Sequence, residues 1–368
     1  MTQTDRPSDQ DVSIEGHSGQ LAVAVARAHG VETMFTLSGA HVFPPMQLLD
    51  VRHEQTAAFA AEATGKLTRV PGLAVLTAGP GVTNGISAIA QAQFAGSPMV
   101  VVGGRAPQNR WGTGSLQELD QPPIVESVAK LARTIPTAGE MLTGMDEAFV
   151  AARSPHRGPA FVDVPMDEFF NSASGAAPVP PQRLRMEPDA DALARIAGLL
   201  AQAQRPVLVL GTDVWADGAE EAALRFVQDL GIPTLTNGMG RGIVPGGHPL
   251  LVTKARGVAL GGADLVVVVG TPLDFRLGYG VFGGNEEGST PARVVHVADS
   301  PAQVSTHAEL AASAAGDLTA VFDGIQAAVE RGAKPDWSTW RQQLADTVAA
   351  AAARDAELLS AEAEALLA

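Results

Sequence analysis

The feature that most constrains this chain is an alternation of short apolar runs with Ala-rich segments whose apolar residues recur every three or four positions. The apolar runs are continuous, which is typical of strands buried on both faces. Strands that alternate with helices favour parallel sheets joined by right-handed crossovers. The sequence therefore predicts an α/β protein with two doubly wound domains and mainly parallel sheets. The predicted strands are 33–37, 73–77, 99–103, 160–164, 207–211, 234–236, 265–270 and 294–298.

A segment rich in Ser, Ala and Pro divides the chain. Residues 172–188 have no apolar period and are predicted to be an exposed linker. A chain of 368 residues fits two domains of ordinary size. We expect a disordered arm at 1–14, a first domain at 15–171, a central nucleotide-binding-like domain at 189–330 and a helical tail at 331–368.

Composition excludes several classes of function. The chain has no cysteine, so disulfides, thiolate metal sites and cysteine nucleophiles are excluded. Its net charge of −15 argues against a nucleic-acid partner. No apolar run reaches membrane-spanning length, and the polar start lacks the apolar core of a signal peptide. We expect a cytoplasmic protein with no nucleic-acid or membrane partner. No set of His, Asp and Glu has the spacing of metal ligands, so no metal ligand is assigned.

The most informative segment is 52–63, where Glu54 begins an otherwise small and apolar helix. Ala57, Ala58 and Ala61 share its face and would let a flat ring or a second helix come close. A carboxylate in the first turn is also favoured by the helix dipole alone, so an ordinary helix start is the alternative.

A tight turn follows the second predicted strand. In residues 78–85 two glycines flank Pro80, and Thr83 and Asn84 are placed to cap the helix that follows. An isolated turn of this kind is common between a strand and a helix.

Taken together, five motifs resemble those of one family. They are LSGA (37–40), RHEQTAAFAAE (52–62), TAGPGVTNG (77–85), VGGRAP (102–107) and GSLQELD (114–120). Their order and spacing resemble the pyrimidine-binding domain of the thiamine-diphosphate-dependent acetolactate synthase family, large catalytic subunit, of actinobacterial type. Many relatives have Pro-Gly-Gly where this chain has Ser-Gly-Ala.

The resemblance implies roles for five residues of the first domain. Glu54 would bond a ring nitrogen of the aminopyrimidine of thiamine diphosphate and so promote formation of the ylid. Gln117 would lie at the mouth of the active site as a second catalytic residue. Gly39, Pro80 and Asn84 would line the cofactor.

The second domain carries Gly, Asp and Arg residues at the carboxyl ends of its predicted strands, where doubly wound sheets bind ligands. It resembles the family's central domain, which binds FAD in acetolactate synthases. Arg276 would then pair with the diphosphate and Asp299 with a ribose hydroxyl. In relatives without a flavin the glycine turns serve only packing. The residues expected to face FAD are Gly211, Thr212, Asn237, Gly238, Met239, Lys254, Arg256, Gly270, Asp274, Arg276, Asp299 and Asp317.

The family's third domain binds the diphosphate through Mg²⁺ and is marked by Gly-Asp-Gly, a motif that this sequence does not contain. We therefore expect a truncated chain that lacks the diphosphate-binding domain, with Mg²⁺ held by that absent domain, and little activity alone.

The family implies decarboxylation of pyruvate and condensation with a second 2-keto acid, in branched-chain amino-acid biosynthesis. A homodimer or tetramer is expected. The alternatives are a related lyase or decarboxylase acting on oxalyl-CoA or 2-hydroxyacyl-CoA, or a non-catalytic protein that binds a flavin or a partner.

Overall fold

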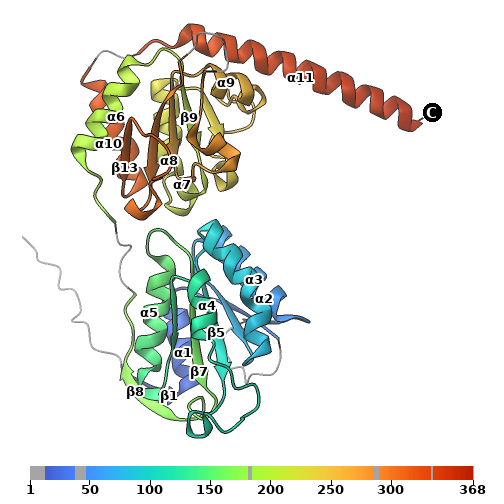
Figure 1. Cartoon of the computed structure of the whole chain (residues 1–368), viewed down its shortest axis with the longest axis vertical. Helices are drawn as coiled ribbons and strands as arrows, with labels where there is room; N and C mark the ends of the chain where they lie inside the picture. Colours follow the sequence, from blue (N-terminus) through green and yellow to red (C-terminus); the bar gives the residue numbers. More distant parts are fainter. Residues whose placement is uncertain (1–12, 38–46, 181–184, 285–289, 333–334, 368) are drawn as a thin grey trace, which may run out of the picture. The chain divides into compact units, whose positions relative to one another are not determined.

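A computed structural model describes residues 13–37, 47–180, 185–284, 290–332 and 335–367, and side chains as far as residue 360. It divides into two compact units, Met1–Leu184 and Arg185–Ala368 (Figure 1). The division falls inside the segment 172–188 that was predicted to be a linker.

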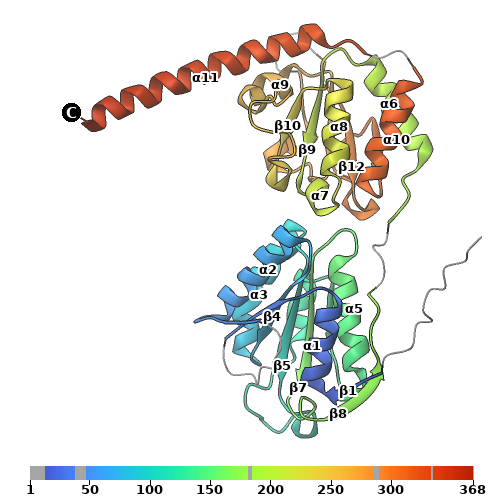
Figure 2. The ribbon, with the colours of Figure 1, turned by 180° about the vertical axis from the view of Figure 1, so that it is seen from behind.

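The first unit is built on a six-stranded parallel sheet with the order β3-β2-β4-β5-β7-β6. One helix pair, α1 with α5, packs on one face, and α2, α3 and α4 cover the other (Figure 2). The strands are β2 (Thr33–Thr36), β3 (Gln47–Asp50), β4 (Gly72–Leu76), β5 (Met99–Arg105), β6 (Leu131–Thr134) and β7 (Pro159–Pro165). The helices are α1 (Ser18–Ala28), α2 (Glu54–Thr68), α3 (Pro80–Ala95), α4 (Pro122–Val125) and α5 (Met141–Arg153), with short 3₁₀ turns η1 (Gln108–Arg110), η2 (Glu126–Val128) and η3 (Ala138–Glu140).

A small antiparallel pair lies outside this sheet and corrects two expectations. β1 (Ser13–His17) begins inside the predicted arm, and β8 (Ser172–Ala176) begins inside the predicted linker. Apart from Ile14, their side chains are small or polar, so neither segment carries an apolar period. The two strands stabilise each other through backbone pairing.

The second unit has a five-stranded parallel sheet with the order β10-β9-β11-β12-β13. α6, α8 and α10 pack on one face, and α9 with the start of α11 packs on the other. The strands are β9 (Pro206–Leu210), β10 (Thr234–Thr236), β11 (Leu265–Val269), β12 (Arg293–Ala298) and β13 (Ala312–Ala315). The helices are α6 (Ala190–Gln202), α7 (Thr212–Ala216), α8 (Glu220–Leu230), α9 (Arg256–Gly262), α10 (Leu318–Glu330) and α11 (Ser338–Leu367), with 3₁₀ turns η4 (Gly238–Gly240), η5 (Thr253–Ala255), η6 (Phe275–Gly280) and η7 (Pro301–Gln303).

Two tryptophans hold the beginning of α11 against this unit. The indole N–H of Trp337 donates to the carbonyl of Ala203, and that of Trp340 donates to Pro206. α11 stays in contact with the unit as far as Asp355, which pairs with Lys254, and its end extends away from the unit (Figure 1). Among the described residues, no helix combines the length and apolar character needed to cross a membrane.

The predicted strands are all present, with ends shifted by at most two residues. Three further strands of the two parallel sheets, β3, β6 and β13, were not predicted. All three lie at sheet edges. None of the three is buried along its whole length, so each lacks the continuous apolar run on which the prediction depended.

Candidate active site

Glu54 lies at the amino end of α2, just after β3, at the carboxyl edge of the first sheet. Its side chain is 7% exposed, and Ala57, Ala58 and Ala61 on the same helix are completely buried. His53 does not orient this carboxylate through a described bond. Instead, its Nδ1 accepts the backbone N–H of Gln55 and caps the helix.

The position of α2 depends on two glycines. A Cβ atom on Gly72 of β4 would lie 1.8 Å from the carbonyl oxygen of Ala61, and one on Gly65 would lie 1.9 Å from that of Pro98. Both distances are far inside van der Waals contact, so the backbone of α2 lies directly on the sheet.

Asn84 connects the next helix to this carboxylate. Its side-chain amide donates a hydrogen bond of 3.0 Å to Oε2 of Glu54. Gly81, one turn earlier on α3, packs closely against Thr77 and the other oxygen, since its Cβ would lie 2.4 Å from Cγ2 of Thr77 and 3.4 Å from Oε1. The structure thus brings together the two residues that sequence motifs 30 positions apart had nominated.

The turn before α3 contains the other predicted residues. Gly79 caps the helix with a positive φ of 59°, and Pro80 takes the first helical position, where its missing N–H costs nothing. Gln117 packs against this turn, because a Cβ on Gly79 would lie 3.1 Å from both Cβ and the carbonyl oxygen of Gln117. Gln117 also has a positive φ, of 58°. The predicted residue Gly39 lies outside the described residues.

The sequence analysis missed a buried polar group beside this turn. Gln121 is completely buried and accepts the Gly79 N–H through Oε1 at 2.8 Å. Its Nε2 donates to the carbonyl of Gly104 and to the carboxylate of Asp163. Arg105 bonds the same carboxylate at 3.0 Å. One signal was available: Asp163 is the only charged residue in the otherwise apolar run 160–164.

In the second unit the predicted glycines pack against their neighbours. A Cβ on Gly211 would lie 2.2 Å from the carbonyl oxygen of Gly270, and one on Gly238 would lie 2.3 Å from Oγ1 of Thr212. The same hydroxyl accepts the backbone N–H of Met239 at 3.3 Å. These five residues form one cluster where β9, β10 and β11 end.

A second cluster surrounds Arg256. Its guanidinium donates to the carbonyl of Arg276 at 2.8 Å and to Oδ1 of Asn237 at 3.4 Å. Burial, with the nearby charge of Arg241, lowers the pKa of Arg256. Arg276 itself is bound by the carboxylate of Asp274 through both of its side-chain oxygens. Asn237 Nδ2 is buried and has no hydrogen-bond partner within the described part of the chain.

Two predicted residues have other partners. Lys254 forms an ion pair of 2.6 Å with Asp355 of α11. Asp317 caps α10, accepting the N–H of Ala320, and also pairs with Arg185. Neither contact requires a ligand.

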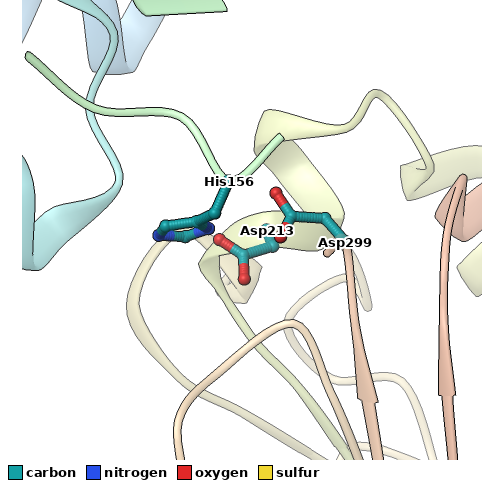
Figure 3. Close-up of side chains that lie close together, drawn as sticks. All are labelled: His156, Asp213 and Asp299. Carbon is teal, nitrogen blue, oxygen red and sulfur yellow. The ribbon is translucent and has the colours of Figure 1, made fainter. Parts of the chain in front are cut away.

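Asp299 follows β12 and is almost completely buried. In the second unit a carboxylate oxygen of Asp299 lies within 4.8 Å of one from Asp213 in the first turn of α7 (Figure 3). The figure also labels His156, which belongs to the first unit. The structure therefore brings most of the predicted residues of each unit to the carboxyl edge of that unit's own sheet.

Comparisons with known proteins identify a family for both units. Residues 17–124 match the model for the thiamine pyrophosphate enzyme N-terminal TPP binding domain, and residues 193–325 match that for the central domain of the same enzymes. The acetolactate synthase large subunit IlvG of Mycobacterium tuberculosis is 47% identical over 355 residues, which cover 93% of this chain and 62% of that protein.

Two more distant similarities are to a lyase and to a solved structure with the same fold. The 2-hydroxyacyl-CoA lyase 2 of Homo sapiens is 33% identical over 309 residues, 72% of this chain and 49% of that protein. A solved structure from Mycobacterium smegmatis is described as that of a thiamin diphosphate-dependent enzyme. It has a TM-score of 0.74 and 23% identity to this chain, and the match covers 88% of this chain and 64% of that one. This similarity supports the fold. The chain spans less than two thirds of the length of these relatives. With both domain models matched in order along its two units, the chain belongs to the thiamine pyrophosphate enzyme family.

Proposed function

We propose that this chain forms the pyrimidine-binding and central domains of an acetolactate synthase, which decarboxylates pyruvate and condenses the product with a second 2-keto acid. The observation that carries the proposal is the buried carboxylate of Glu54, held by Asn84 in a cradle of alanines. The similarity to the mycobacterial large subunit supports the same reaction. Thiamine diphosphate, when bound, supplies the carbon nucleophile.

In this mechanism Glu54 holds a proton at its carboxylate, shared with a ring nitrogen of the bound aminopyrimidine. The residues present suit such a ring, because Glu54 lies at the amino end of α2 beside Ala57 and Ala58, whose side chains are single methyl groups. Asn84 fixes the second oxygen and so sets the direction in which the carboxylate can share its proton. Gln117, at the Gly79 turn, would contact the 2-keto acid. In this proposal the diphosphate and Mg²⁺ are bound by another domain of the complete enzyme.

A direct test is acetolactate formation from pyruvate by the complete enzyme in the presence of thiamine diphosphate and Mg²⁺. We expect Glu54→Gln to reduce kcat by about 10²-fold or more, as for the loss of a group that transfers protons. Glu62→Gln is a matched control, since Glu62 is buried on the same helix but bonds Ser97 instead. Equal activity of wild type and Glu54→Gln would reject the proposal.

The 2-hydroxyacyl-CoA lyases are a second candidate, favoured by their similarity over most of this chain. Cleavage of a 2-hydroxyacyl-CoA, with no acetolactate from pyruvate, would favour a lyase. A protein that binds nucleotide but turns over neither substrate would indicate a binding role.

We also propose that the second unit binds a flavin such as FAD. The support is the buried Nδ2 of Asn237, which has no hydrogen-bond partner among the described residues, beside the guanidinium of Arg256, an arrangement that suits a phosphate-bearing ligand. The glycine turns at Gly211, Gly238 and Gly270 do not add support, because neighbouring backbone or side-chain atoms already fill the Cβ side of each. The proposal predicts that the purified wild-type protein shows the visible absorption of a bound flavin and that Arg256→Ala does not. A colourless protein that binds neither FAD nor ADP in calorimetry would reject it.

We propose further that the protein is a cytoplasmic homodimer or tetramer that associates through the first unit. Phe59 and Leu67 on α2 and Phe94 on α3 are exposed, and Phe94 is 85% accessible. Large exposed apolar side chains of this kind are common at subunit contacts. Sedimentation of wild type and Phe94→Glu would test this, with a shift toward monomer expected for the variant.

A further inference from the structure

Gln121 joins three segments, at Gly79, Gly104 and Asp163, and its hydrogen bonds define its orientation. The two acceptors around Nε2, the Gly104 carbonyl and the Asp163 carboxylate, can only accept bonds, so the NH₂ group must face them. Oε1 is then directed at the N–H of Gly79, 2.8 Å away.

Both backbone polar groups of Gly79 are therefore hydrogen-bonded. Its N–H donates to Gln121, and its carbonyl accepts the N–H of Thr83 at 3.1 Å, the first hydrogen bond of α3. Asn84, which bonds Glu54, is the next residue. The turn at Gly79 therefore sets where Asn84 lies relative to the carboxylate.

The Gln121 backbone is also fixed. Its carbonyl accepts the N–H groups of Ile124 and Val125 at the start of α4. Arg105 pairs with Asp163 and also with Asp120, the residue before Gln121. The side chain of Gln121 thus extends from a well-braced loop rather than from a free one.

We propose that Gln121 is a positioning residue for the Glu54 site: it holds the Gly79 turn so that Asn84 stays bonded to Glu54. The importance of the site rests on the proposed function, but the relationship between these residues does not. Gln121 would act through Gly79 and Asn84 and would not touch the cofactor or the substrate.

The experiment compares the full chain with Gln121→Met and Gln121→Glu by NMR, without thiamine diphosphate. Met keeps the volume and removes all three bonds, whereas Glu keeps an acceptor for Gly79 but places a carboxylate against Asp163. Gln91→Met is the matched control, because Gln91 is exposed on α3. The readouts are exchange of the Gly79 amide and the side-chain amide resonance of Asn84, with Glu54→Ala as the reference for a broken bond.

We expect Gly79 to exchange on the order of tenfold faster in Gln121→Met, and the Asn84 resonance to move toward the Glu54→Ala reference. Gln91→Met should change neither. Faster exchange with an unmoved Asn84 resonance would make Gln121 a simple turn anchor and overturn the proposal. An unprotected Gly79 amide in the wild-type chain would overturn it without any variant, so a failure of the variants to fold does not prevent the test.

Activity assays then separate this proposal from the proposed function. If Glu54→Gln remained fully active, the catalytic role of Glu54 would fail while the NMR relationship could still hold. If Glu54→Gln is inactive but Gln121→Met changes neither resonance, exchange nor kcat, the function stands and the positioning role fails.

Discussion

The side-chain amide of Asn84 donates to Oε2 of Glu54 across 3.0 Å, joining the amino-terminal parts of two helices that follow different strands. Glu54 is buried while Asn84 is exposed, so the amide approaches the carboxylate from the solvent side. The pair therefore serves the geometry of the site more than the stability of the core.

Replacing Asn84 should affect activity before stability. We expect Asn84→Ala to lower kcat for acetolactate formation by about tenfold, since Glu54 loses the bond that directs it, and to change the free energy of unfolding by less than about 1 kcal/mol. Asn84→Asp should cost more activity, because two carboxylates would repel. Steady-state kinetics and urea unfolding on the same samples test both claims, and a large loss of stability in Asn84→Ala would contradict them.

The opposite pattern is expected at Glu62. Ser97 donates to its carboxylate at 2.6 Å, and both residues are buried. Glu62→Ala should lower the free energy of unfolding by about 1–3 kcal/mol because it leaves the buried Ser97 hydroxyl without this acceptor. Glu62→Gln, which keeps an acceptor oxygen, should cost less. Urea denaturation measures the difference, and equal stability of all three proteins would be inconsistent with this view.

Gly211 should be required for packing whether or not a nucleotide binds. Gly211→Ala would force a methyl group to within 2.2 Å of the Gly270 carbonyl oxygen, and we expect a loss of about 2 kcal/mol or more. Gly257, inside α9, has no atom within 4 Å of the position that a methyl group would take, so Gly257→Ala should be neutral or stabilise by up to about 1 kcal/mol. Thermal unfolding of both variants checks the contrast.

The second unit should lose stability as pH falls through the histidine range. Burial lowers the pKa of His296, outweighing its bond to the Thr271 carbonyl. Nδ1 of His296 accepts the N–H of Ser305, so the neutral ring satisfies both partners. Because the unfolded chain takes up a proton first, this contribution is complete above about pH 6.5 and is lost below it.

Urea unfolding between pH 7.5 and 5.5 measures this effect. Burial also lowers the pKa of His29, so protonation of His29 adds a further loss of folding stability as the pH falls. In His296→Gln, the free energy of unfolding should depend less steeply on pH than in the wild type. An unchanged slope in that variant would mean that His296 does not contribute.

Sequence patterns predicted the interior of both sheets well, because a strand buried on two faces must be apolar throughout. They failed at β6 and β13, whose edge positions permit polar or very small residues. They also failed at β8, which is defined by pairing with a segment about 160 residues earlier along the chain. No local pattern reports such a partner.

The site was predictable to a similar extent. Glu54, Pro80 and Asn84 follow strands, and motif order identified them. Gln121 was missed because its importance comes from three bonds made in space, and a glutamine before two prolines looks like an ordinary helix start. The role of Lys254 likewise depends on a distant partner, Asp355, which is 101 residues away along the chain. Asp317 caps its own helix by accepting the N–H of Ala320, three residues later.

The backbone contacts at Gly65 and Gly72 have a consequence for how this protein can diverge. At these two contacts backbone meets backbone directly, so no side chain there can change in size and shift the helix. Mutations elsewhere in the core can alter its volume while the carboxylate of Glu54 keeps its height above the sheet. Under the proposed function, the loops around Glu54 could change in sequence while the position of this carboxylate stays the same.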